Sequence, residues 1–169
     1  KNRGPRLGLY CARPKTRLMG IQFSTYSSDK KLQDYNSGAL VTNNDVPPAN
    51  KNQYGPNQEM GPGGYVWRKY ADPRYYGSVT STSYEDELDV PIMRYAELLL
   101  IDAEANIEWA GGDLKRAADN INQVRARVKM PKVDGSSRES LRKALRYERK
   151  VELCAEGFRW FDLRRWGND

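Results

Sequence analysis

The feature that most constrains this chain is the helical periodicity between Pro91 and Trp166. Apolar residues there recur every three or four positions, a spacing that places them on one face of an α-helix. Pro91 suits a first helical turn, and Gly111 with Gly112 is expected to end the helix. The predicted buried face of this first helix consists of Ile92, Tyr95, Ala96, Leu99, Leu100, Ala103 and Ile107.

Two further helices are predicted after it. Asp113 is expected to cap the second helix, which ends before Pro131 and buries Leu114, Ala117, Ala118, Ile121, Val124 and Val128. Because the turn between these two helices is short, they must lie antiparallel. A capping box at Ser136 to Glu139 predicts the start of the third helix. Its predicted face is Leu141, Ala144, Leu145, Val151 and Ala155, and an aromatic cap is expected after Gly157.

The first two helices together resemble one tetratricopeptide unit, a helix-turn-helix of about 34 residues. Only one such pair is visible in the sequence. A single pair cannot bury its apolar face alone, so we expect it to stack on helices upstream of this chain.

Residues 1–90 carry little apolar periodicity. Leu7 to Cys11 and Leu18 to Phe23 are short apolar pieces, and they predict one or two short strands. Further along, aromatic residues alternate with turn-forming glycines and prolines. Such rings form a platform on which the C–H face of a sugar can stack, and loops carried by a scaffold often hold function. The candidate carbohydrate-binding residues are Trp67, Tyr54, Tyr65, Tyr75 and Tyr76. The alternative is that these rings close the core beneath a long loop.

A stripe of carboxylates marks the third helix, because Glu148, Glu152 and Glu156 follow one another at four-residue spacing. Like charges so placed repel unless cations answer them. We therefore predict a structural network of carboxylates and guanidiniums. A glycosidase carboxylate pair is the functional alternative, but it needs an open cleft, whereas apolar residues bracket this stripe. The predicted network comprises Arg94, Glu97, Arg125, Arg127, Glu148, Glu152, Glu156 and Arg159.

Composition argues against most other functions. The 169 residues include no histidine, the commonest general base and metal ligand, and only two cysteines. No phosphate-binding glycine loop is present, so we expect no cofactor, no metal and no catalysis. The acidic run Glu85 to Asp89 lacks the glycine-bearing spacing of a calcium loop and suits a helix N-terminus instead. The net charge of +6 forms no basic block, so no nucleic-acid partner is expected.

Several motifs carry a family resemblance. In order along the chain they are Arg94-Tyr95-Ala96-Glu97-Leu98-Leu99-Leu100, Asp102-Ala103-Glu104-Ala105, Ile121-Asn122-Gln123-Val124-Arg125-Ala126-Arg127, Glu148-Arg149-Lys150-Val151-Glu152-Leu153 and Glu156-Gly157-Phe158-Arg159-Trp160-Phe161-Asp162-Leu163-Arg164-Arg165-Trp166. Together they resemble the carboxy-terminal part of the SusD/RagB family, surface glycan-binding lipoproteins of Bacteroidetes. The resemblance is strong over residues 65–167 and thin before them.

The resemblance implies a mainly α SusD-like fold. Residues 1–90 would form an irregular, aromatic-rich loop segment, and residues 91–169 the helical carboxy-terminal segment of the same domain. It also implies a function, the non-catalytic capture of an oligosaccharide or polysaccharide at the outer face of the outer membrane. The glycan would pass to a SusC-like TonB-dependent transporter, and the lipid anchor would lie outside this fragment. A helical-repeat scaffold that binds only a protein partner is the alternative.

Overall fold

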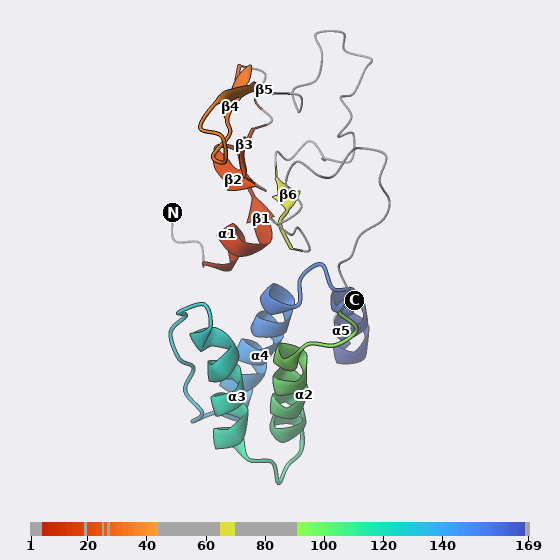
Figure 1. Ribbon diagram of the computed structural model, residues 1–169. Helices are drawn as coiled ribbons and strands as arrows, with labels where there is room; N and C mark the ends of the chain where they lie inside the picture. The colour runs from red at the N-terminus through yellow and green to blue at the C-terminus, as the bar shows by residue number, and fades with distance from the viewer. Residues whose placement is uncertain are drawn as a thin grey trace. The chain divides into compact units, whose positions relative to one another are not determined.

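The computed structural model describes residues 5–18, 20–24, 26, 28–43, 65–69 and 91–167. The chain divides into two compact units (Figure 1). A helical unit comprises Lys1–Arg6 with Asp89–Asp169, and a strand-containing unit comprises Leu7–Leu88. Arg6, near the start of the chain, thus belongs to the helical unit.

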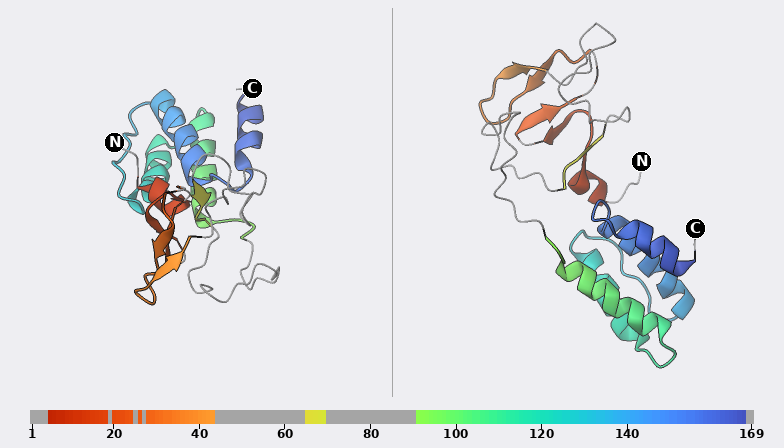
Figure 2. Two further views of the ribbon diagram at one scale, coloured as in Figure 1. Left: turned by 90° about the horizontal axis from the view of Figure 1, so that it is seen from above. Right: turned by 90° about the vertical axis from the view of Figure 1, so that its right-hand side faces the viewer.

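The helical unit is built from α2 (Tyr95–Glu108), α3 (Leu114–Ala126), α4 (Arg138–Glu152) and α5 (Phe158–Trp166). Figure 2 shows α2, α3 and α4 side by side, with α5 following α4. Their packing confirms the mainly α fold predicted from the periodicity. The shared core consists of Leu99, Leu100, Ala103, Ile107, Ala117, Ala118, Ile121, Val124, Leu141, Leu145 and Leu153.

Of the three predicted helix starts, one agrees with the structure and two are displaced along the sequence. Asp113 caps α3 by accepting a hydrogen bond from the Arg116 backbone N–H at 3.0 Å. For α4 the capping residue is Ser137 rather than Ser136, because the Ser137 side chain accepts from the Ser140 N–H. Glu139 therefore does not close a capping box, and its carboxylate pairs with Lys143 at 2.7 Å. Ala155, predicted on the face of this helix, lies beyond its end with a positive φ of 63°.

The first helix begins later than predicted. Arg94 is its N-cap, in an extended conformation, so Pro91 and Ile92 precede the helix. Ile92 is 95% exposed and Tyr95 64% exposed, and neither belongs to the core. The physical reason is that the Arg94 guanidinium reaches Glu152 and Glu156 across the bundle, which fixes an extended backbone where the pattern predicted a helical turn.

The strand-containing unit begins at Leu7, inside a short helix, α1 (Arg6–Tyr10), although the apolar run from Leu7 predicts a strand there. Five strands follow among the described residues before position 50, more than the one or two predicted. They are β1 (Cys11–Ala12), β2 (Thr16–Leu18), β3 (Ile21–Phe23), β4 (Lys31–Gln33) and β5 (Leu40–Thr42). A sixth, β6 (Val66–Trp67), lies much later in the sequence and pairs with β1.

All pairing between the described strands is antiparallel, in three two-stranded sheets of order β1-β6, β2-β3 and β4-β5. The β2–β3 turn needs Gly20, whose φ is +89°, because an added Cβ there would lie 2.3 Å from the Asn36 side chain. Asp34 shapes the β4–β5 turn by accepting a 2.8 Å hydrogen bond from the Asn36 backbone N–H, as aspartates in turns commonly do. Local turn chemistry therefore positions β2 with β3 and β4 with β5.

Candidate functional site

The strand β6 presents two of the predicted carbohydrate-binding rings to solvent. Trp67 lies in β6 and Tyr65 just before it, two residues apart, so both side chains leave the ribbon on the same side. Trp67 is 54% exposed and Tyr65 is 46% exposed. On the other side of the ribbon Ala12 is fully buried and Val66 is half-buried. The ribbon therefore has an apolar inner side and an aromatic outer side.

Contacts of the Arg68 and Lys69 side chains fix where β6 lies. Arg68 donates from Nη1 to the Gly8 carbonyl at 3.0 Å and from Nη2 to the Arg17 carbonyl at 2.7 Å. Its guanidinium thus ties β6 to α1 and β2. Lys69 places its ammonium 4.5 Å from the centre of the buried Tyr10 ring, a cation–π contact. Both cations hold the aromatic strand in place.

The other three candidate rings, Tyr54, Tyr75 and Tyr76, lie outside the described residues. Across the ribbon from Trp67 is Cys11, its register partner in β1. Burial raises the pKa of the Cys11 thiol above its ordinary value, so the thiol stays protonated and adds no charge to the face. The described part of the candidate site is therefore the outer face of the β1–β6 ribbon.

The carboxylate stripe of α4 lies in the interior of the helical unit. Glu148 is fully buried, and its two oxygens accept hydrogen bonds from Arg6 and from Arg125, the latter at 2.9 Å. Arg125 also donates to the Pro131 carbonyl at 2.6 Å, which ties the loop after α3 to the same group. A buried carboxylate stays charged only if such donors replace its water.

Glu152, one turn later, is also fully buried. It accepts from Arg6 at 2.9 Å, from Arg94 at 3.3 Å and from Arg127 at 2.6 Å. Glu156 pairs with both ends of the same Arg94 fork, at 2.9 and 2.6 Å. The hydrogen bond to Glu156 raises the pKa of the Arg94 guanidinium, and the nearby Glu156 and Glu152 charges add to the rise.

This arrangement suits structure better than acid–base catalysis. Glu148 and Glu152 have no exposed surface, and guanidiniums occupy the oxygens that a substrate would need. A general acid or base must reach the proton that it transfers, directly or through one water. We therefore assign these carboxylates to holding α2, α3 and α4 together through arginines from each neighbouring segment.

Two predicted members of the network lie apart from it. Glu97 is buried in α2, and its Oε2 has no hydrogen-bond partner among the described residues. Arg159 is exposed at the start of α5. The helical periodicity of the sequence predicted where both residues lie along their helices. It could not predict the direction in which either side chain points.

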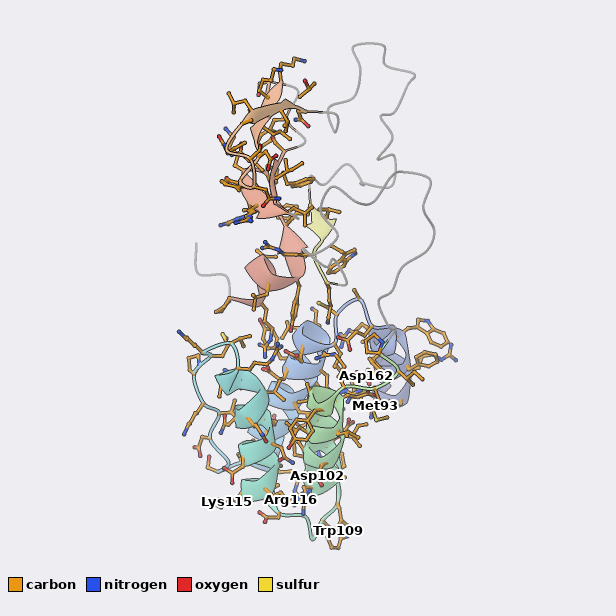
Figure 3. All side chains as sticks on the ribbon, viewed as in Figure 1. Met93, Asp102, Trp109, Lys115, Arg116 and Asp162 are labelled. Carbon is orange, nitrogen blue, oxygen red and sulfur yellow. The ribbon has the colours of Figure 1, made fainter. Side chains whose placement is uncertain are left out.

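Sequence reasoning also missed several partners. Arg6 completes the network from 142 positions away, and no local signal marks it. A second cluster joins α5 to the other helices, where Asp162 accepts two hydrogen bonds from the buried Arg149 at 2.9 and 3.0 Å. Glu104 on α2 accepts from the Trp166 indole N–H at 2.7 Å and from Arg165. Figure 3 labels Asp162 on α5, and also Asp102 on α2, which pairs with Arg116 of α3 at 2.7 and 2.8 Å.

The aromatic cap predicted after Gly157 is only partly buried. Phe158 packs against the core, but Trp160 is 58% exposed and Phe161 is 64% exposed. Their rings meet edge to face with centres 5.1 Å apart, and Arg164 stacks on Trp160. Phe158 therefore packs inward, whereas Trp160 and Phe161 of the same helix face solvent.

Within the part of the chain that the structure describes, no three histidine, cysteine or acidic side chains gather as metal ligands would. The acidic run Glu85 to Asp89 lies outside the described residues. Among the described helices, none combines the length and the apolar character that a membrane crossing requires.

Comparison with known proteins agrees with this architecture. Two curated relatives come from Formosa agariphila. SusD-like protein P38 is 29% identical over 122 residues, which cover 56% of this chain and 24% of P38. SusD-like protein P2 is 34% identical over 100 residues, covering 54% of this chain and 20% of P2.

A crystal structure shows the same likeness in three dimensions. A SusD-like protein of Bacteroides fragilis superimposes with a TM-score of 0.61 at 25% identity, covering 99% of this chain and 28% of that one. The chain thus spans less than a third of the length of these proteins. The model of the SusD family matches residues 4–169, nearly the whole chain. With its motifs, its fold and this match in agreement, the chain belongs to the SusD family.

Proposed function

We propose that the full-length protein captures an oligosaccharide or polysaccharide at the outer surface of the outer membrane, without cleaving it. It then delivers the glycan to a SusC-like TonB-dependent transporter, while a lipid anchor outside this fragment holds it to the membrane. Proteins of the SusD family generally bind glycans and serve nutrient uptake, and membership in that family supports the proposal.

The observation that carries the proposal is the exposure of Trp67 and Tyr65 on one side of the β1–β6 ribbon. Rings that merely filled the core would be buried, because their large apolar area is favourable only out of water. Instead the two hydrogen bonds that the Arg68 guanidinium donates hold β6 so that both rings face solvent. This exposure favours a glycan platform over the alternative, a scaffold that binds only a protein partner.

Replacing Trp67 with alanine is expected to weaken glycan binding by about 2 kcal/mol, the usual threshold for an anchor residue at an interface. The physical reason is the loss of the largest stacking face on the ribbon. Calorimetric titration of the full-length protein with a glycan that it binds would measure the change. Trp109→Ala is the matched control, since Trp109 is 69% exposed on the helical unit. Unchanged affinity in Trp67→Ala would move the site elsewhere, and lost folding would make Trp67 a core residue.

The purified full-length protein is expected to release no reducing ends from any glycan that it binds. The prediction rests on the enclosure of Glu148 and Glu152 by arginines, which leaves neither carboxylate exposed. The check is a reducing-sugar assay over hours at the concentration that saturates binding. Hydrolysis that disappears in a folded Glu152→Gln variant would overturn the non-catalytic assignment.

A further inference from the structure

The face that carries Trp67 and Tyr65 also carries a cation. Cys11 pairs with Trp67 and Ala12 with Val66, so the same antiparallel register places Arg13 opposite Tyr65, one step beyond the strands. Residues that face each other across an antiparallel pair project to the same side. Arg13 thus stands on the aromatic side of the ribbon, and it is exposed (Figure 1 shows β1 and β6 paired).

The backbone of Arg13 is fixed while its side chain is free to bind. The Arg13 N–H donates to the Thr16 hydroxyl at 3.1 Å, and its carbonyl accepts from that hydroxyl at 2.7 Å and from the Thr16 N–H at 3.0 Å. Among the described residues, no carboxylate or carbonyl accepts a hydrogen bond from the Arg13 guanidinium. This differs from Arg68, whose guanidinium is occupied by two carbonyls.

Among the described residues of the strand-containing unit, cationic side chains outnumber carboxylates. The described residues of the strand-containing unit include seven cations, Arg13, Lys15, Arg17, Lys30, Lys31, Arg68 and Lys69, against two carboxylates, Asp29 and Asp34. Both carboxylates serve turns. Asp29 accepts from the Ser24 hydroxyl at 2.6 Å, and Asp34 from the Ser37 hydroxyl at 2.7 Å. Neither of these two carboxylates accepts a hydrogen bond from Arg13, so its guanidinium is available to an anionic group.

We infer that the glycan taken by this face is acidic, with Arg13 binding an anionic group of the sugar, a carboxylate or a sulfate ester. The inference rests on the proposed function, because it names the class of glycan for the same site. A guanidinium binds planar carboxylates and sulfates through two parallel N–H donors, which adds specificity as well as affinity. Stacking on Trp67 and Tyr65 holds the C–H face of the ring, and Arg13 reads its charged substituent.

The test compares matched pairs of glycans with the full-length protein. Uronate oligosaccharides are measured beside their carboxyl-reduced forms, and sulfated oligosaccharides beside their desulfated forms. We expect the charged member of a pair to bind at least about tenfold more tightly, the effect of one hydrogen bond to a charged group. Its affinity is also expected to fall as salt rises. The two pairs distinguish a carboxylate from a sulfate as the group recognised.

Arg13→Gln is expected to remove that tenfold preference and to leave the binding of the neutral member unchanged. Lys30→Gln is the matched control, since it removes one exposed positive charge from the same unit away from the β1–β6 ribbon. Equal affinity for both members of every pair would overturn the acidic-glycan assignment while the proposed function stands. Binding to no glycan in either set and to no neutral glycan would overturn the proposed function itself. A preference that survives in Arg13→Gln would show that another residue reads the charge.

Discussion

Replacing Glu148 with glutamine is expected to destabilise the helical unit by about 3 kcal/mol or more, the range for a broken buried ion pair. Glu148 is fully buried, and it accepts from Arg6 and Arg125, whose side chains are only 7% and 12% exposed. Glutamine keeps the shape but removes the charge, so two guanidiniums buried from water lose a partner. Its amide also brings N–H donors toward groups that are themselves donors only.

The measurement is urea denaturation of the full-length protein, followed through the signal of the helical unit. Glu139→Gln serves as the control, because Glu139 is an exposed residue of the same helix that pairs with Lys143. Glu139→Gln should unfold at nearly the same urea concentration as the unchanged protein, because exposed ion pairs contribute little to the free energy of unfolding. If Glu148→Gln unfolds at the same urea concentration as Glu139→Gln, the Glu148 carboxylate does not stabilise the packing of the helices.

The helices were predictable because their pattern is local. Residues such as Leu99, Ala103 and Ile107 follow the helical period, and the core that they form needs no long-range information to anticipate. The helix ends were harder to predict. Ser136 and Ser137 are both competent caps, and only the three-dimensional path of the loop selects Ser137.

The charge network was predictable in type but not in full membership. Three glutamates at four-residue spacing require cations, which is a statement about one helix. The identity of those cations depends on tertiary structure. Arg94 and Arg125 lie in recognisable motifs, whereas Arg6 lies in a segment with no helical periodicity and reaches Glu152 from 146 positions away. Long-range pairs of this kind leave no periodic trace in a single sequence.

The candidate site was the least predictable part of the molecule. The density of aromatic residues between glycines and prolines indicated a platform. The same ring, however, would fill the core if it were buried and could bind a sugar only if it were exposed. Trp67 is exposed because β6 pairs with β1, a contact between segments separated by more than fifty residues. The role of Arg13 depends on that same register. Neither followed from composition, because both depend on which strands meet.

Replacing Asp162 with asparagine is expected to destabilise the protein by about 3 kcal/mol, again through a broken buried pair. Asp162 is 3% exposed and Arg149 is 5% exposed, and the two form a bidentate pair at 2.9 and 3.0 Å. Without the charge of Asp162, Arg149 keeps a long ion pair with Glu104, whose oxygen lies 4.0 Å from the Arg149 Nε. Arg165 also donates to Asp162 at 2.7 Å, so the variant weakens a second attachment of α5.

Amide hydrogen exchange should locate the loss in α5, because Asp162 belongs to that helix and Arg149 to α4. Asp119→Asn, at an exposed residue paired with Lys115, is the control and should exchange like the unchanged protein. A double variant, Arg149→Met with Asp162→Asn, separates the pair from the two residues. If the pair carries the effect, the double variant will be less destabilised than the sum of the single variants, since neither charge is left buried alone. Additive losses would instead mean that Arg149 and Asp162 act through separate neighbours, and that Glu104 with Trp166 holds α5 on α2 without them.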